Sequence, residues 1–487
     1  MKKKAAKKYP LITLGDSLSL GFQNGAVCST QYSYPSILAK LLEDKLFQTV
    51  SFTSQGGIPL NMEVLLKGIE EEFGTELGWD DALLISNSLV STLLRIKRYW
   101  EQDWSRFHQN RELNQPFSNQ SLFSATVNDV FVLTDADCNY ILDRHISVGN
   151  RFQILPQNAF YTAARRVINP SLSLLEKTST LFSNVKWFSD HGGMEHFIVF
   201  LGANNLVGAL TDLKILEATE ADLYKKPFER NVTVYSSHLF KESFESLAEK
   251  LSKLSINYIY TATIPDITKV PLLQKIEFAD ICIYTHIWVK KEDFDKDVHP
   301  FLTENELNYL QTLLIEYNEI IKETAQKNGW KVLDVYAIVE KLHQRQFNEV
   351  IPAAAIRALR KNKKTRYLVR NDNSLSIDTQ FPEINESTGQ LIHGGIFSLD
   401  GLHPTTFAYA LIAFGFQQLM QENGQKFNQV FDWDRIIEND TILTDTPLLI
   451  NDLRKVLYYI SADYSKLFSK LGKHLFEEFS QIFGGKI

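Results

Sequence analysis

Five short runs of apolar residues recur along the chain, and each is bounded by turn residues such as Gly, Pro, Asn or Asp. The runs are continuous rather than alternating between apolar and polar positions, which is typical of strands buried on both faces of a parallel sheet. They occupy residues 10–14, 49–53, 197–201, 257–262 and 331–335. The pattern therefore predicts a five-stranded parallel sheet.

Helix-like segments lie between these runs, with apolar residues at three- and four-residue spacing. They span residues 36–47, 242–254 and 304–327. Alternation of buried strands with amphipathic helices predicts an α/β fold of three layers, in which helices cover both faces of the sheet.

The spacing of the strands is uneven, because about 140 residues separate the second run from the third, more than one crossover helix needs. We interpret residues 74–184 as a mainly helical insertion, with helices predicted at 81–96 and 157–168. Between these helices lies an aromatic cluster of Tyr99, Trp100, Trp104 and Phe107.

The remaining chain divides around this insertion. Residues 1–73 and 185–431 would form the α/β core, and residues 432–487 a helical C-terminal tail, with apolar residues at helical spacing through 453–483. A second insertion, at about 345–396, contains a basic stretch at 357–370 and a polar stretch at 371–389 that predicts a long loop.

Composition and charge narrow the class of protein. The chain has 487 residues, 44% hydrophobic and 22% charged, as in ordinary globular proteins. Its net charge is −7 and its Lys and Arg residues are scattered, so a nucleic-acid partner is not expected. Three widely spaced cysteines match no metal or redox motif, which favours a reducing compartment.

The N-terminus is rich in lysine from Lys2 to Lys8, but no apolar signal-peptide core follows it. No run of 18 apolar residues occurs in the sequence, so no transmembrane helix is predicted and we expect a cytoplasmic location. The lysines could favour transient contact with an anionic membrane surface, although a solvated basic tail is the commoner explanation.

The first candidate for chemistry is Ser17, in Gly15-Asp16-Ser17-Leu18. A strand ends at Gly15 and a helix is predicted to begin just after Ser17. This places a hydroxyl at the carboxyl edge of a parallel sheet, where open α/β folds bind ligands, beside the N–H groups of a helix N-terminus. The alternative is that Ser17 simply caps the helix.

A second candidate is the pair Asp400 and His403, in Asp400-Gly401-Leu402-His403. Two residues three apart on a helical turn face the same side, so the carboxylate could orient the imidazole as a general base. The alternative is a capping Asp followed by a surface His. A third candidate, Asn204, follows the run 197–201 in Gly202-Ala203-Asn204-Asn205, where its amide could donate to an oxyanion.

These three segments occur in the order Ser, Asn, Asp-x-x-His, and in this the sequence resembles the GDSL/SGNH hydrolase superfamily. The resemblance implies a flavodoxin-like SGNH fold in which Ser17 is the nucleophile, His403 the base and Asp400 its orienting partner. It covers only the core segments. Asn205 departs from the family pattern, which usually has Asp at this position.

The resemblance also implies an oxyanion hole made by the Ser17 N–H, the Asn204 side chain and a glycine N–H of a second block. Gly56 or Gly57, just after the run 49–53, could supply that glycine, and Gly57 is favoured. No zinc or phosphate-loop motif occurs, so no metal or other cofactor is expected.

The leading hypothesis is therefore a hydrolase of carboxylic esters that works through an acyl-enzyme. Aromatic and aliphatic residues in the insertion 74–184 favour a lipid ester, of lipase or lysophospholipase type, as the substrate. Small acetyl esters, including acetylated carbohydrate, are the alternative substrate. A non-catalytic binding protein that keeps the same fold is the alternative class.

Overall fold

The computed structural model describes residues 7–75, 82–101, 115–148, 158–170, 177–278, 281–289, 291–372 and 374–452. The lysine-rich residues 2–6, the aromatic residues Trp104 and Phe107, and the predicted helical tail beyond residue 452 lie outside the described residues.

A parallel five-stranded sheet forms the centre of the molecule, with strand order β11-β7-β6-β1-β5. The strands span Tyr9–Gly15 (β1), Asn119–Ser121 (β5), Met194–Phe200 (β6), Ile256–Ala262 (β7) and Lys331–Leu333 (β11). The predicted α/β fold with a five-stranded parallel sheet is thus confirmed. Apolar side chains account for the buried position of β1 and β6, because Leu11, Ile12 and Ile198 are all fully buried.

One strand prediction is wrong. Residues 49–53 form no strand, and their side chains alternate between buried (Val50, Phe52) and exposed (Ser51, Thr53). The position beside β1 belongs instead to β5, whose Asn119 pairs with Thr13. The segment 74–184, which we predicted as an insertion, therefore supplies an edge strand of the central sheet.

Polar residues can form this buried strand because their hydrogen-bonding groups are paired. Asn119 Nδ2 donates to the Ser19 carbonyl at 2.8 Å, and Gln120 Oε1 accepts from Asn184 Nδ2 at 3.0 Å. Ser121 Oγ donates to Asn119 Oδ1 at 2.6 Å.

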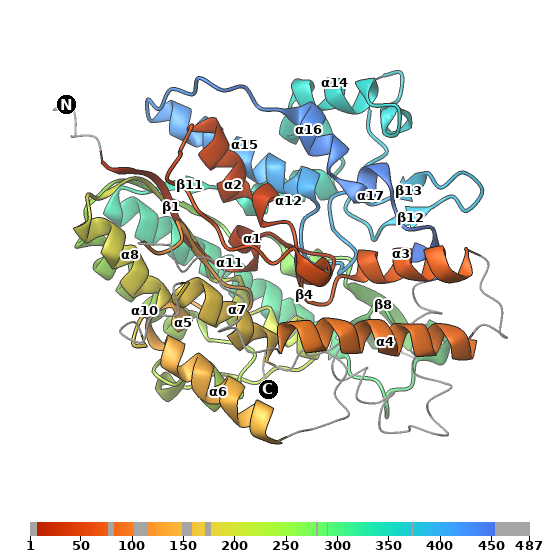
Figure 1. The fold of residues 1–487 in the computed structure, drawn as a ribbon, viewed down its shortest axis with the longest axis horizontal. Helices are drawn as coiled ribbons and strands as arrows, with labels where there is room; N and C mark the ends of the chain where they lie inside the picture. The colour runs from red at the N-terminus through yellow and green to blue at the C-terminus, as the bar shows by residue number, and fades with distance from the viewer. Residues whose placement is uncertain are drawn as a thin grey trace.

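Helices cover both faces of the sheet (Figure 1). Helices α2 and α15 lie against one face, and α8, α10 and α11 against the other. The helices span Ser17–Leu20 (α1), Tyr34–Leu41 (α2), Met62–Phe73 (α3), Ala82–Trp100 (α4), Asp129–Val132 (α5), Asp135–Val148 (α6), Ala159–Ile168 (α7), Leu181–Asp190 (α8), Gly208–Asp212 (α9), Ser237–Ser252 (α10), Glu304–Asn328 (α11), Val335–His343 (α12), Phe347–Val350 (α13), Ala353–Lys361 (α14), Thr406–Glu422 (α15), Trp433–Glu438 (α16) and Thr441–Thr444 (α17).

The predicted helices at 81–96, 157–168, 242–254 and 304–327 correspond to α4, α7, α10 and α11. Helix α2 ends at Leu41, before the predicted end at residue 47. The chain turns there because Glu43 adopts a left-handed conformation (φ 55°) and the Asp44 carboxylate accepts the N–H groups of Leu46 and Phe47.

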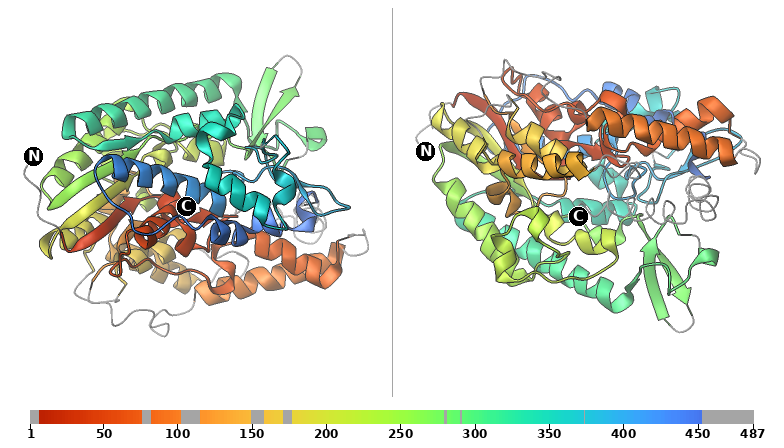
Figure 2. Two further views of the ribbon diagram at one scale, coloured as in Figure 1. Left: turned by 90° about the horizontal axis from the view of Figure 1, so that it is seen from above. Right: turned by 60° about the horizontal axis from the view of Figure 1, so that its bottom comes forward.

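Three small sheets also lie in the described part of the chain. The first joins β2 (Phe22–Gln23), β3 (Ala26–Val27) and β4 (Ile58–Pro59). The second joins β8 (Leu273–Phe278), β9 (Ile281–His286) and β10 (Leu302–Thr303), and its hairpin projects near the start of α11 (Figure 2). The third pairs β12 (Glu383–Ile384) with β13 (Leu391–His393). Among the helices of the described residues, none is both long and apolar enough to cross a membrane.

Candidate active site

Ser17 is the first residue of α1, directly after the carboxyl end of β1. The Asp16 carboxylate caps this short helix by accepting the Leu18 N–H at 3.0 Å. The turn from strand to helix is so tight that a Cβ on Gly15 would lie 2.1 Å from Ser19 Oγ. Because Ser17 begins the helix, its N–H has no intrahelical acceptor.

The three residues predicted to act together form one hydrogen-bonded chain. His403 Nε2 lies 2.9 Å from Ser17 Oγ, and His403 Nδ1 lies 3.1 Å from Asp400 Oδ2. A proton on Nδ1 donates to Asp400, which leaves Nε2 as the acceptor for the Ser17 hydroxyl. Asp400 is fully buried, while Ser17 and His403 each retain 8% exposure beside a cavity.

Asp400 is held as a carboxylate by its surroundings. Its Oδ1 accepts the N–H groups of Leu402 and His403 at 2.9 and 2.8 Å, and its Oδ2 accepts the Gly25 N–H at 3.0 Å. Burial alone would raise the pKa of Asp400, but the imidazole of His403 and these N–H donors outweigh it, so the pKa lies below its usual value.

Asn24 fixes the loop that carries Asp400. Its backbone N–H donates to Ser398 Oγ at 2.9 Å, and its side-chain oxygen accepts the Leu399 N–H at 3.0 Å. Its amide nitrogen donates to the buried Glu63 carboxylate at 2.8 Å. Asn24 was not among the predicted site residues, although Asn24-Gly25 is the dipeptide most typical of a two-residue hairpin turn, here the one between β2 and β3.

The imidazole of His403 also has an aromatic neighbour. The Phe22 ring lies 4.5 Å from the His403 ring, measured between centroids. The Tyr409 hydroxyl donates to the Phe22 carbonyl at 2.7 Å and thereby ties α15 to this segment. The imidazole is therefore confined between its two hydrogen-bonding partners and a packed ring.

Asn204 lies where the sequence places it, in the turn after β6, and it borders the same cavity as Ser17 and His403. One hydrogen of its Nδ2 donates to the Ala125 carbonyl at 3.1 Å, which leaves the second for another acceptor. Its neighbour Asn205 accepts the Val127 N–H at 3.1 Å. Both amides thus bind the segment that follows β5.

Ser124, in that segment, was not predicted. It borders the cavity and adopts a left-handed conformation with φ 60°, which is rare for residues other than glycine. The turn is braced by Asp129, which accepts the N–H and hydroxyl of Thr126 at 2.8 Å each. The guanidinium of Arg230 forms a buried ion pair with Asp129.

Gly57 does not fit the oxyanion role that we predicted for it. Its N–H donates to the Ser54 carbonyl at 3.1 Å, and its own carbonyl accepts from Trp100 Nε1 at 2.8 Å. Neither Gly57 nor Gly56 borders the cavity beside Ser17. The reason is the strand order: β5, and not residues 49–53, lies beside β1, so the segment after β5 follows the neighbouring strand.

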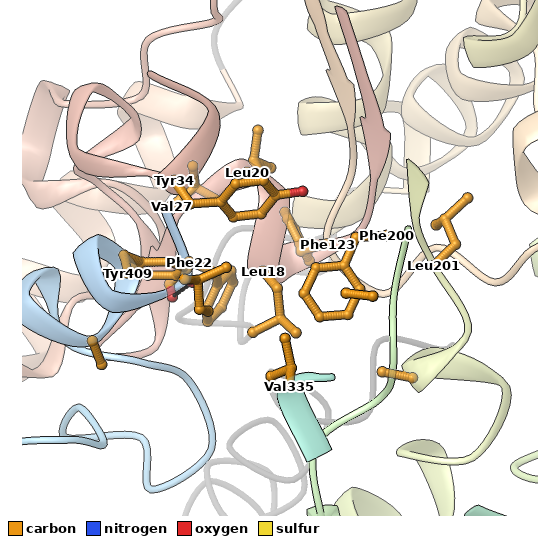
Figure 3. Close-up of a cluster of buried hydrophobic side chains, with 14 of the residues drawn as sticks. Leu18, Leu20, Phe22, Val27, Tyr34, Phe123, Phe200, Leu201, Val335 and Tyr409 are labelled. Carbon is orange, nitrogen blue, oxygen red and sulfur yellow. Dashed lines mark hydrogen bonds between the residues drawn. The ribbon is translucent and has the colours of Figure 1, made fainter. Parts of the chain in front are cut away.

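The cavity has a volume of about 40 Å³ and is walled mainly by apolar side chains. Its lining comprises Ser17, Leu18, Phe22, Phe123, Ser124, Ala203, Asn204, Val207, Pro265, Ile267, Leu402 and His403. Leu18, Phe22 and Phe123 belong to the buried apolar cluster drawn in Figure 3. In the described part of the chain, no three His, Cys, Asp or Glu side chains are arranged to hold a metal ion.

The arrangement brings together a hydroxyl, an imidazole, a carboxylate and N–H donors at the carboxyl ends of β1, β5 and β6. No family model matches the chain, and no curated protein sequence matches it. Among solved structures, the chain is similar to LAE5, an alpha/beta hydrolase enzyme from the metagenome of Lake Arreo, Spain, with 11% sequence identity and a TM-score of 0.27 over 86% of this chain and 97% of that chain. A TM-score this low carries no argument about function.

Proposed function

We propose that the chain is a serine hydrolase of carboxylic esters, of the GDSL/SGNH type. The observation that carries the proposal is the hydrogen-bonded chain from Ser17 Oγ through both ring nitrogens of His403 to the buried Asp400. This is the arrangement by which a neutral imidazole removes a proton from a hydroxyl and gains stabilisation from the carboxylate behind it.

In the proposed reaction, Ser17 Oγ attacks the ester carbonyl while His403 Nε2 takes the hydroxyl proton. The alcohol leaves with that proton, which gives an acyl-enzyme on Ser17. Water then attacks the acyl-enzyme and passes a proton to His403, and the acid is released. Asp400 orients His403 and stabilises the imidazolium in both steps.

The developing oxyanion would be held by the Ser17 N–H, the second hydrogen of Asn204 Nδ2 and the Ser124 N–H. Three features support this set: all three residues border the cavity, they follow three adjacent strands, and Ser17 N–H begins a helix. Ser124 takes the place that the sequence analysis gave to Gly57. Loss of one such donor costs roughly 10²–10³ in kcat.

The direct test is hydrolysis of p-nitrophenyl acetate and butyrate by the full chain and by Ser17→Ala. We expect the variant to lose at least about 10³-fold in kcat. A fluorophosphonate probe should label the wild-type chain on Ser17, read by peptide mass spectrometry.

Ser19→Ala is the matched control. Ser19 lies on the same helix, but its hydroxyl is paired with the Tyr34 hydroxyl at 2.7 Å and it does not border the cavity. The control should keep its activity. Hydrolysis that persists in Ser17→Ala would contradict the assignment of Ser17 as the nucleophile. The absence of any Ser17-dependent turnover would favour the non-catalytic alternative.

A further inference from the structure

We propose that the cavity beside Ser17 favours acyl groups of about two to four carbons over long fatty acyl chains. The proposal rests on the proposed function. It reverses the order of substrates that the sequence suggested, because short-chain esters then come before lipid esters.

The first argument is volume. The cavity measures about 40 Å³, and a cavity needs roughly 10–15 Å³ to hold one water. The space therefore holds about three non-hydrogen atoms, which is enough for the methyl of an acetyl group or, at most, the propyl of a butyryl group beyond the carbonyl. A fatty acyl chain would need a tunnel several times larger.

The second argument is that one wall is backed by packed rings. Phe123 is 4% exposed, and its ring lies 5.3 Å from that of Phe22 and 6.1 Å from that of Phe160 on α7. Phe22 in turn packs against His403. The wall cannot recede without moving rings in a close-packed interior, one of which touches the imidazole.

The third argument is that two further lining residues, Ile267 and Leu402, come from turns fixed by hydrogen bonds. Ile267 is 3% exposed and lies in a turn that Asp266 caps through the N–H and hydroxyl of Thr268. Leu402 follows Gly401, whose carbonyl accepts the Leu272 N–H at 2.9 Å. Both residues come from turns whose backbones are already tied to their neighbours.

Two aromatic residues of the first predicted insertion, Tyr99 and Trp100, do not enlarge this space. Trp100 is 1% exposed and uses its indole N–H to bind the Gly57 carbonyl. Its ring packs on Phe52 and Tyr99, with the Arg166 guanidinium 4.8 Å from its centroid. Neither Tyr99 nor Trp100 borders the cavity.

The test is the chain-length profile of kcat/KM for p-nitrophenyl acetate, butyrate, octanoate and laurate, measured with the full chain. Acetate or butyrate should exceed octanoate by roughly tenfold or more, since methylenes that do not fit a pocket cost about that much in specificity. Phe123→Ala should raise the ratio of kcat/KM for octanoate to kcat/KM for acetate, and Phe160→Ala should also raise this ratio.

Phe431→Ala is the matched control, because Phe431 packs on Trp433 at 4.5 Å and does not border the cavity. Its ratio of octanoate to acetate should equal that of the wild type. Ser17-dependent hydrolysis of octanoate or laurate as fast as acetate would overturn the short-acyl proposal and leave the proposed function standing. If Ser17→Ala leaves the hydrolysis of every ester unchanged, the proposed function itself fails. If Phe123→Ala does not fold, the wild-type chain-length profile and Phe160→Ala test the short-acyl proposal.

Discussion

Asp16 carries an unusual charge state for a residue next to a nucleophile. Burial raises its pKa to about 7, although the Leu18 N–H and the nearby His403 act in the opposite direction. Its Oδ1 accepts the Leu18 N–H, whereas its Oδ2 is buried without a partner among the described residues. Below about pH 7 the folded chain therefore keeps a proton at Asp16 that the unfolded chain has released above about pH 4.

This proton makes stability depend on pH. Because the pKa is raised in the folded state, the contribution is fully present below about pH 4 and is lost as pH rises through about 7. Relative to Asp16→Asn, the wild type should lose on the order of 4 kcal/mol in the free energy of unfolding between pH 4 and 8. Asp16→Asn should lack it.

Urea unfolding at a series of pH values measures this difference. Ser17→Ala is the control, because it changes the neighbouring residue but keeps the carboxyl, and its pH profile should follow that of the wild type. Parallel profiles for the wild type and Asp16→Asn would show that Asp16 ionises in the folded chain as it does in the unfolded one.

Ser124 offers a test of which atom stabilises the oxyanion. Its φ of 60° suits glycine better than serine, so Ser124→Gly should raise the free energy of unfolding by about 1 kcal/mol. Since the proposed donor is the backbone N–H, Ser124→Gly should also keep kcat within a few-fold. Ser124→Val, with a β-branched side chain in this conformation, should lower both stability and kcat. A large loss of kcat in Ser124→Gly would instead make the hydroxyl the donor.

At the scale of elements, β5 depends on paired polar groups rather than on apolar burial. Asn119→Leu would leave the Ser19 carbonyl and the Ser121 hydroxyl without the partner that Asn119 now provides. We expect it to lower the free energy of unfolding by roughly 1–3 kcal/mol, measured by urea denaturation. Gln115→Leu, which removes only a part-exposed hydrogen bond to the Leu46 carbonyl, should change it by less than about 0.5 kcal/mol. Equal effects of the two substitutions would mean that the buried polar pairing contributes little.

The same strand marks where prediction from sequence succeeds and where it fails. Apolar runs located β1 and β6 because burial on both faces leaves a continuous hydrophobic pattern. They also located β7 and β11, which are less completely buried. The strand Asn119–Ser121 has no such pattern, since its polar groups are satisfied by residues as distant as Ser19 and Asn184. The apolar run at 49–53 predicts a strand where β5 actually lies, and this wrong strand placed the expected oxyanion donor at Gly57.

Some residues of the candidate site could likewise be predicted from the sequence, and others could not. Ser17, Asn204, Asp400 and His403 could be placed from local turn chemistry and from their order along the chain. Asn24 could not be given its role, because its hydrogen bonds to Ser398 and Leu399 join segments more than 370 residues apart. Such contacts follow from the tertiary fold, which no local pattern in a single sequence records.

At the scale of the whole molecule, the site depends on how the segment after β5 is attached to the rest. Arg230, in the connection between β6 and α10, pairs with Asp129 at the start of α5, and both side chains are nearly inaccessible. The guanidinium also donates to the Tyr235 hydroxyl at 2.7 Å. Asp129 holds Thr126, two residues beyond Ser124, so this ion pair braces the turn that borders the cavity.

Arg230→Met keeps much of the buried volume but leaves the Asp129 carboxylate without its counter-charge. An unpaired buried charge costs about 3–5 kcal/mol, so the melting temperature should fall sharply. Adding Asp129→Asn removes that charge and should restore part of the lost stability, because an amide can still accept the Thr126 N–H. The melting temperatures of the single and double variants, together with their kcat on p-nitrophenyl acetate, separate the effect of the ion pair on stability from its effect on catalysis. Recovery of stability without recovery of kcat would mean that the guanidinium itself orients the Ser124 turn. A double variant no more stable than Arg230→Met would contradict the claim that the unpaired Asp129 carboxylate causes the loss of stability.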